Sequence, residues 1–150
     1  MKGLVKIFIF TALVFCFTIR PASSENVNAL TLKMFVVYAS NENQNVDRQL
    51  NFVKEELGSL FHYTSYQLLD TPVENFRLSE AKEISLPSGH TAFVRYLGVH
   101  GRRIHLRLQI KNTKETVVNT DFEIVNDGNV IVGGPAYKKG ALILVLHGVY

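Results

Sequence analysis

Residues 90–111, HTAFVRYLGVHGRRIHLRLQIK, decide the fold class of this chain. On both sides of the stretch GVHG, apolar residues alternate with polar or charged ones, which predicts β-strands at residues 90–97 and 103–111. GVHG carries two glycines and is the expected turn of a hairpin between the two strands. A register that sets Tyr96 opposite Ile104 gives the hairpin one apolar face for the core. That face holds Ala92, Val94, Tyr96, Ile104, Leu106, Leu108 and Ile110.

The opposite face of this hairpin is the candidate binding site, and it is rich in cations. Cross-strand neighbours lie about 5 Å apart, so the residues would form a compact basic patch. The planar fork of arginine suits carboxylate and phosphate groups, so the patch could bind an acidic protein face, an anionic glycan or a lipid head group. The alternative is a solvated sheet face whose cations pair with Glu115, Asp121 and Glu123. The candidate binding residues are Phe93, Arg95, Arg103, His105 and Arg107.

The rest of the chain predicts one helix and further short strands. Residues 46–60 place Val46, Leu50, Val53, Leu57 and Leu60 on one stripe at helical spacing, which indicates packing against a sheet. The expected class is α+β: one N-terminal helix packed on a mostly antiparallel β-sheet or sandwich of about eight short strands. Besides the hairpin, the strand candidates are residues 30–39, 63–69, 76–78, 84–86, 116–125, 129–132 and 141–146.

The last strand candidate, ALILVL at residues 141–146, is apolar enough to require cover. If it lies at a sheet edge, it could accept a strand from a partner or donate one. The alternative is a central core strand with neighbours on both sides. The sequence favours the central position but leaves both open.

The N-terminus predicts export. Lys2 and Lys6 precede the apolar run at residues 7–19, and Ala22 and Ser24 are small residues suited to cleavage before Glu25. We expect a signal peptide at residues 1–24 and a single β-rich domain at residues 25–150, in the periplasm or another extracytoplasmic space. The alternative is that the segment is kept as an anchor, which is the one route to membrane contact.

Removal of a signal peptide would change the net charge of the chain. Lys2, Lys6 and Arg20 leave with the signal, so the 16 Lys and Arg residues fall to 13 and equal the 13 acidic ones. The basic character of the full chain is therefore no indication of nucleic-acid binding. The only cysteine, Cys16, lies in the predicted signal, so the mature domain has no disulfide and no thiolate nucleophile or ligand.

One short motif suggests catalysis and three features argue against it. Pro87-Ser88-Gly89-His90 resembles a signature of the type-2 phosphatidic-acid phosphatase family, whose histidine helps to protonate the leaving group. The partner motifs are missing: Arg-Pro occurs only at Arg20-Pro21 and Ser-Arg is absent. The flanks alternate as strands do, so we expect a hairpin turn. The histidines are scattered without H-E-x-x-H spacing. We expect no catalytic residues, no metal and no cofactor.

Two resemblances concern location. The stretch NDGNVIVGG at residues 126–134 resembles a hairpin segment of bacterial secretins, and the mature chain is similar to small exported bacterial domains of uncharacterised function. Both imply an envelope location and neither transfers a functional residue. We therefore expect a non-enzymatic accessory protein whose partner is another exported or envelope protein, including further copies of this chain. The alternative is a binding module for an anionic glycan or lipid.

Overall fold

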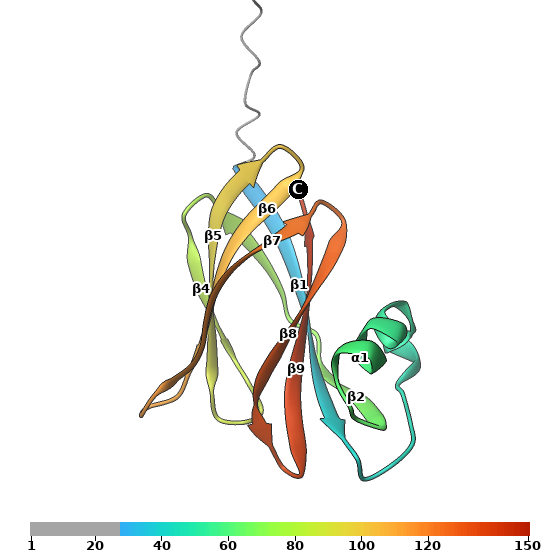
Figure 1. Ribbon diagram of the computed structural model, residues 1–150. Coiled ribbons are helices and arrows are strands. Elements are labelled where there is room, and N and C mark those ends of the chain that lie inside the picture. The colour runs from blue at the N-terminus through green and yellow to red at the C-terminus, as the bar shows by residue number, and fades with distance from the viewer. Residues whose placement is uncertain (1–27) are drawn as a thin grey trace, which may run out of the picture.

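The computed structural model describes residues 28–150 and folds them into a sandwich of two antiparallel sheets (Figure 1). The first sheet has the order β2-β1-β9-β8, with β3 paired to the other end of β1, and the second has the order β4-β5-β6-β7. The predicted signal at residues 1–24 lies outside the described residues. The strands are β1 (Ala29–Ser40), β2 (Ser65–Asp70), β3 (Val73–Arg77), β4 (Ala81–Ser85), β5 (Thr91–His100), β6 (Arg103–Lys111), β7 (Thr116–Val125), β8 (Gly128–Tyr137) and β9 (Gly140–Val149).

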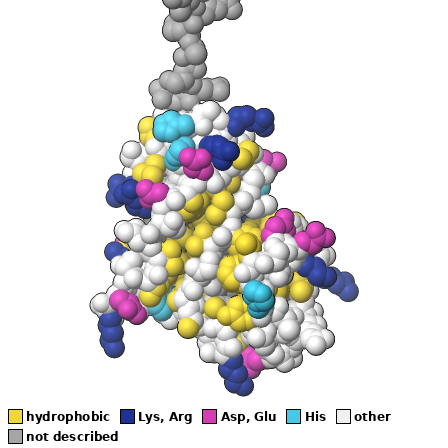
Figure 2. Space-filling model, viewed as in Figure 1, with side chains coloured by type: hydrophobic (Ala, Val, Ile, Leu, Met, Phe, Trp, Pro, Cys, Tyr) yellow, Lys and Arg dark blue, Asp and Glu magenta, His cyan; other side chains and the backbone are white. Residues whose placement is uncertain are grey.

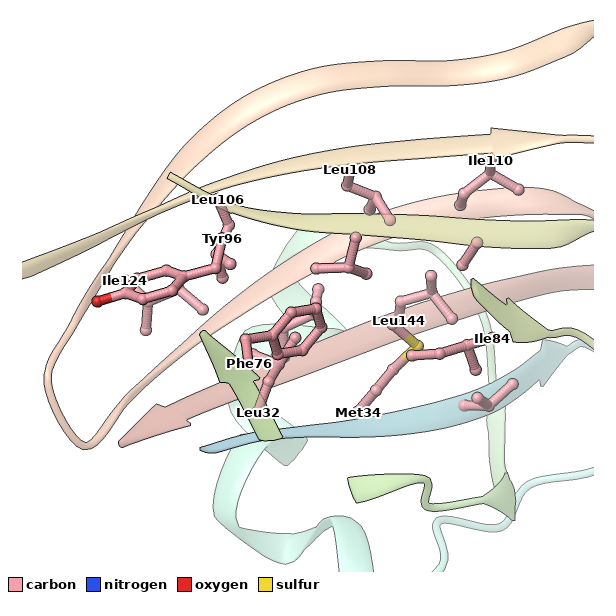
Figure 3. Packing of buried hydrophobic residues seen from close by; sticks show 14 of the residues in the cluster. Leu32, Met34, Phe76, Ile84, Tyr96, Leu106, Leu108, Ile110, Ile124 and Leu144 are labelled. Carbon is pink, nitrogen blue, oxygen red and sulfur yellow. The ribbon is translucent and has the colours of Figure 1, made fainter. Parts of the chain in front are cut away.

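The main core lies between the two sheets. Because successive side chains of a strand point to opposite faces, every second residue of the central strands enters this layer. Figure 3 shows Met34 and Leu144 of the first sheet across from Leu108 of the second, and all three side chains are fully buried. Each such side chain contributes roughly 1.5–3 kcal/mol of hydrophobic stabilisation. The alternation seen in the sequence therefore sets which faces of the sheets meet.

The helical segment lies in the middle of the chain, so the expectation of an N-terminal helix is wrong. It follows β1 and consists of a 3₁₀ turn, η1 (Arg48–Val53), and a short helix, α1 (Lys54–Leu60). Asp47 begins η1 and its carboxylate accepts a hydrogen bond from the Gln49 N–H. At Val53 the backbone leaves helical geometry, with φ −129° and ψ 13°. The apolar spacing of residues 46–60 correctly placed Leu50, Val53 and Leu57 on the side that faces the sheet. It was wrong for Leu60, which is mostly exposed, and it cannot report this break.

A second, smaller core joins this helical segment to the outer face of the first sheet. Leu50, Val53 and Leu57 are buried against Val37 and Ile143 of the sheet. The single hydroxyl proton of Tyr66 is shared between the carbonyls of Leu57 (3.0 Å) and Phe61 (2.9 Å), at the C-terminal end of α1. The first sheet is therefore covered on both faces.

Strand β9 is central in the first sheet, so the central position that the sequence favours for residues 141–146 is confirmed and the edge position is wrong. It pairs with β1 on one side and β8 on the other. The five residues from Leu142 to Leu146 have no exposed surface. A strand with neighbours on both sides and cover on both faces cannot accept or donate a strand without unfolding.

The β5–β6 hairpin has the predicted faces but a different register. Tyr96 lies opposite Leu106, and Ile104 lies opposite Val99, with an irregularity between Tyr96 and Gly98. The strands run on to His100 and Arg103, and Gly101 enters the tight turn with φ +62°. Tyr96 is displaced by two residues from the predicted pairing, and an even displacement returns each side chain to its own face.

Two glycine substitutions test this packing. A Cβ on Gly140 would stand 2.9 Å from the carbonyl carbon of Ala39 and would clash with its oxygen, while a Cβ on Gly58 of α1 would meet nothing within 4 Å. We expect Gly140→Ala to lower the free energy of unfolding by about 1–3 kcal/mol through overpacking. Gly58→Ala, the control, should raise it by about 0.5–1 kcal/mol through helix propensity. Urea unfolding measures both, and equal effects would contradict the β1–β9 packing.

Candidate functional site

The five predicted binding residues all lie on the outer face of the second sheet, and we call this set the arginine face. Arg95 of β5 is directly opposite Arg107 of β6, and Phe93 is opposite Gln109. Arg103 and His105 lie nearer the Gly101 end of the hairpin, opposite His100 and Gly98. The alternation of β5 and β6 places these side chains outward because the intervening residues fill the core.

Acidic side chains of β7 neutralise much of the arginine face. Arg107 donates two hydrogen bonds of 2.7 Å to the carboxylate of Asp121. Arg103 and His105 approach the two oxygens of Glu123 at 3.4 and 3.5 Å. The alternative interpretation expected three acids to pair with these cations, and Asp121 and Glu123 are two of them. The third, Glu115, forms no ion pair within residues 28–150. Exposed pairs of this kind stabilise a fold little, because water and salt screen them.

The Arg107–Asp121 pair also shifts the protonation of both groups. The hydrogen bond from Arg107 lowers the pKa of the Asp121 carboxyl below its usual range, against the smaller effect of desolvation. The hydrogen bond to Asp121 raises the pKa of the Arg107 guanidinium. Both groups therefore keep their charges across the physiological range, and the arginine is already occupied by a carboxylate of its own chain.

Two cations on this face are not tied to acids. The Lys111 ammonium lies 3.8 Å from the centre of the Phe93 ring, a cation–π contact. Arg95 is exposed and forms no ion pair with any residue in the described part of the chain. A shallow hollow of about 450 Å³ beside Arg107 is lined by Arg107, Gln109, Asn119, Thr120 and Asp121.

The sequence missed a histidine pair on the arginine face. His100 Nδ1 and His105 Nε2 are 3.3 Å apart, and the two rings are in edge contact. The prediction placed His100 inside the turn, whereas β5 continues to that residue. A hairpin turn assigned to Gly101-Arg102, in place of GVHG as a whole, would have extended both strands and brought the two rings together.

Exposed hydrophobic side chains gather on another face, which carries β7, β8 and the helical segment (Figure 2). Val118 and Phe122 of β7 and Val130 and Val132 of β8 pack on the main core but stay partly exposed, and we call these four residues the apolar seam. Next to β8, a hollow of about 450 Å³ includes Val53, Leu60 and Ile131 in its lining. Leu60 of α1 is 57% exposed. Contiguous exposed apolar surface is typical of a contact site for another molecule.

The Pro87-Ser88-Gly89-His90 stretch forms the predicted turn between β4 and β5. Gly89 has φ +77°, a conformation that glycine adopts without strain. The His90 ring contacts the Ser88 hydroxyl at 3.1 Å and the Asn112 amide at 3.1 Å. The resemblance to a phosphatase motif is therefore carried by a polar turn.

Residues 126–134 do not form a hairpin within one sheet. They leave β7 in the second sheet and enter β8 in the first. Across residues 28–150, no three His, Cys, Asp or Glu side chains are gathered so that they could hold a metal ion. No helix in that range is long and apolar enough to cross a membrane.

Neither a protein-family model, nor a curated protein, nor a solved structure matches this chain. The class that the described residues define is an antiparallel two-sheet β-sandwich with one helical segment on an outer face. The arginine face and the apolar seam are its two candidate functional surfaces.

The Arg107–Asp121 pair gives a pH-dependent prediction. In Arg107→Gln the pKa of Asp121 should rise towards its ordinary value of about 3.9, because the donor that holds it down is gone. A lowered folded-state pKa stabilises the fold above the ordinary pKa, and this contribution is lost as pH falls below it. NMR titration of the carboxyl carbon measures the change. Glu42 is the control, since its pKa is lowered by the Tyr38 hydroxyl of β1 and by Lys139 in the β8–β9 turn, neither of which belongs to the second sheet. An unchanged Asp121 pKa in the variant would contradict the pairing.

Proposed function

We propose that this protein is an exported, non-enzymatic accessory subunit that binds another protein of a bacterial envelope assembly. The observation that carries the proposal is the exposed apolar surface on the face of β7, β8 and α1 (Figure 2). Protein interfaces have apolar centres depleted in charge and a polar rim. The N-terminal sequence supports export, since residues 1–24 have the charge and apolar pattern of a signal peptide.

Charge distribution favours this face over the arginine face as the principal contact. Arg103 and Arg107 already have acidic partners on β7, so an external anion would have to compete with carboxylates held at 3.4 and 2.7 Å. The apolar seam has no such competitor, and its cover by a partner would remove apolar surface from water.

Capture of a partner tests the proposal. The tagged full-length chain would be recovered from the envelope fraction of its native host, at low salt and at about 1 M salt, where the Debye length is only about 3 Å. We expect a stoichiometric protein partner that survives high salt. Leu60→Glu should reduce its recovery by about tenfold, because it removes an exposed apolar side chain from the hollow at β8 and adds a second carboxylate to the one that Glu56 already supplies.

Val73→Glu is the matched control, because Val73 is 52% exposed but lies on β3, at the other side of the first sheet. It should leave partner recovery unchanged. Recovery of the protein without a partner would count against the proposal. So would an equal loss of partner recovery in Leu60→Glu and Val73→Glu.

A second candidate function is binding of an anionic glycan or lipid by the arginine face. The observation in its favour is Arg95, which has no acidic partner in residues 28–150 and lies directly opposite Arg107. On an immobilised sulfated glycan, Arg95→Ala should elute at lower salt than the wild type. Asp121→Asn should elute at higher salt, because it releases Arg107. Arg48→Ala, on η1, is the control. Identical elution of all four proteins would exclude this function.

A further inference from the structure

The free edge of β7 differs from the other sheet edges in how it is protected. β2 and β3 are short and are separated at Thr71-Pro72. β4 has five residues and carries the inward-pointing Lys82, which pairs with Glu74 at 2.9 Å. β8 has an irregularity between Gly133 and Ala136 that contains Pro135. Short strands, inward charges, proline and bulges are the usual means of blocking edge pairing.

β7 has only one of these protections, an irregularity at its first residues, where Lys111 lies opposite Thr116 and Ile110 opposite Val118. It runs for ten residues, TVVNTDFEIV, without proline, glycine or a basic residue. Its pairing with β6 is regular from Arg103 to Ile110, so the strand presents a long and regular edge. Its inward side carries Val118 and Phe122 of the apolar seam, which pack on the main core but stay partly exposed.

The hydrogen-bond pattern shows which backbone groups of β7 face outward. The Asn126 N–H donates to the Arg102 carbonyl at 3.0 Å, so this pair, next to Val125–Arg103, is a hydrogen-bonded pair. Such pairs alternate along an antiparallel ladder. The even-numbered residues of β7 therefore bond to β6, and Asn119, Asp121 and Glu123 direct their backbone groups to the free edge.

These outward groups have little cover. The Asp121 carbonyl accepts a hydrogen bond from the Thr120 hydroxyl at 3.3 Å. Outside the strand ladders, no other backbone segment of residues 28–150 bonds to Asn119, Asp121 or Glu123. An added strand would supply the missing partners.

We propose that the free edge of β7 accepts an extended segment of the partner protein, with apolar residues at alternate positions and basic residues between them. This rests on the proposed function, because it names the strand through which the partner binds. The apolar residues would cover Val118 and Phe122 inside the seam. The basic residues would lie beside Asp121 and Glu123, the two acids on the outward face of β7, and would share these carboxylates with the cations of β6 that already pair with them.

β6 shows what a complementary neighbour of β7 looks like. Its sequence, RIHLRLQIK, places apolar side chains inward and Arg103, His105, Arg107 and Lys111 outward. On its outward side it forms ion pairs with Asp121 and Glu123. A second copy of β7 fits poorly, since this strand has two acids and no basic residue, and pairing with itself would set acid against acid.

A peptide binding experiment tests the strand itself. The probe is a capped synthetic peptide with the sequence RIHLRLQIK, added to the whole protein, and the control peptide is EIHLELQIE. Amide hydrogen exchange of Asn119, Asp121 and Glu123 should slow by about tenfold with the basic peptide and much less with the acidic one. The Glu83 amide is the internal control, because it faces the free edge of β4. Exchange that is unchanged at all three β7 amides, or slowed equally at Glu83, would overturn the proposal.

Variants separate this proposal from the proposed function. Asn119→Pro removes an outward N–H, and Glu83→Pro, its matched control, removes the equivalent group from β4. In the partner capture, only Asn119→Pro should lose the partner. If both variants keep it, the subunit function stands and the β7 edge is not its site. A third outcome is that the wild type captures no partner, while the basic peptide still protects the three β7 amides. In that case the free edge of β7 accepts a strand, and the subunit function fails.

A variant with reversed charges on β7 tests the proposal even if Asn119→Pro does not fold. Asp121→Lys with Glu123→Lys keeps the backbone of β7, and should reverse the preference between the two peptides. An unchanged preference would overturn the basic character of the partner segment. A dimer of the wild type that Asn119→Pro converts to a monomer would overturn the choice of partner in favour of a second copy.

Discussion

The burial of β9 on both faces is the constraint on which the rest of this structure depends. Leu142, Leu144 and Leu146 point into the core between the sheets, and Ile143 and Val145 point towards the helical segment. A strand that is apolar on both faces requires two layers of cover. The second sheet supplies one layer, and η1 with α1 supplies the other. The position of the helical segment over the outer face of the first sheet follows from the same requirement.

The two candidate contact surfaces differ in how completely their strands are paired. The arginine face is the solvated side of a complete, paired sheet, and its cations are largely satisfied by acids of the neighbouring strand. The apolar seam lies where β7 and β8, the last strands of the two sheets, have no further neighbour. Unpaired backbone and partly exposed core side chains therefore occur together in one place. This coincidence makes β7 the more suitable surface for a protein partner.

Several features of the candidate site could be predicted from local pattern. Alternation identified Phe93, Arg95 and Arg107 as outward residues, and this assignment survived a change in register because the displacement of Tyr96 was even. The tight turn at Gly101-Arg102 was missed, because two glycines in GVHG allow more than one turn. As a result, His100 was placed in a loop and its contact with His105 was not expected.

The sequence by itself determined most of the strands, the inward and outward faces of the β5–β6 hairpin, and most of the apolar side of the helical segment, because these depend on periodicities of a few residues. The short strands β3 and β4 each begin three residues before their predicted ranges. The tertiary structure alone decided that residues 141–146 are central, that Arg107 is held by Asp121, and that β7 ends its sheet. These properties depend on which strands become neighbours. Strand order joins residues far apart in the chain, and alternation is the same for a central strand and an edge strand.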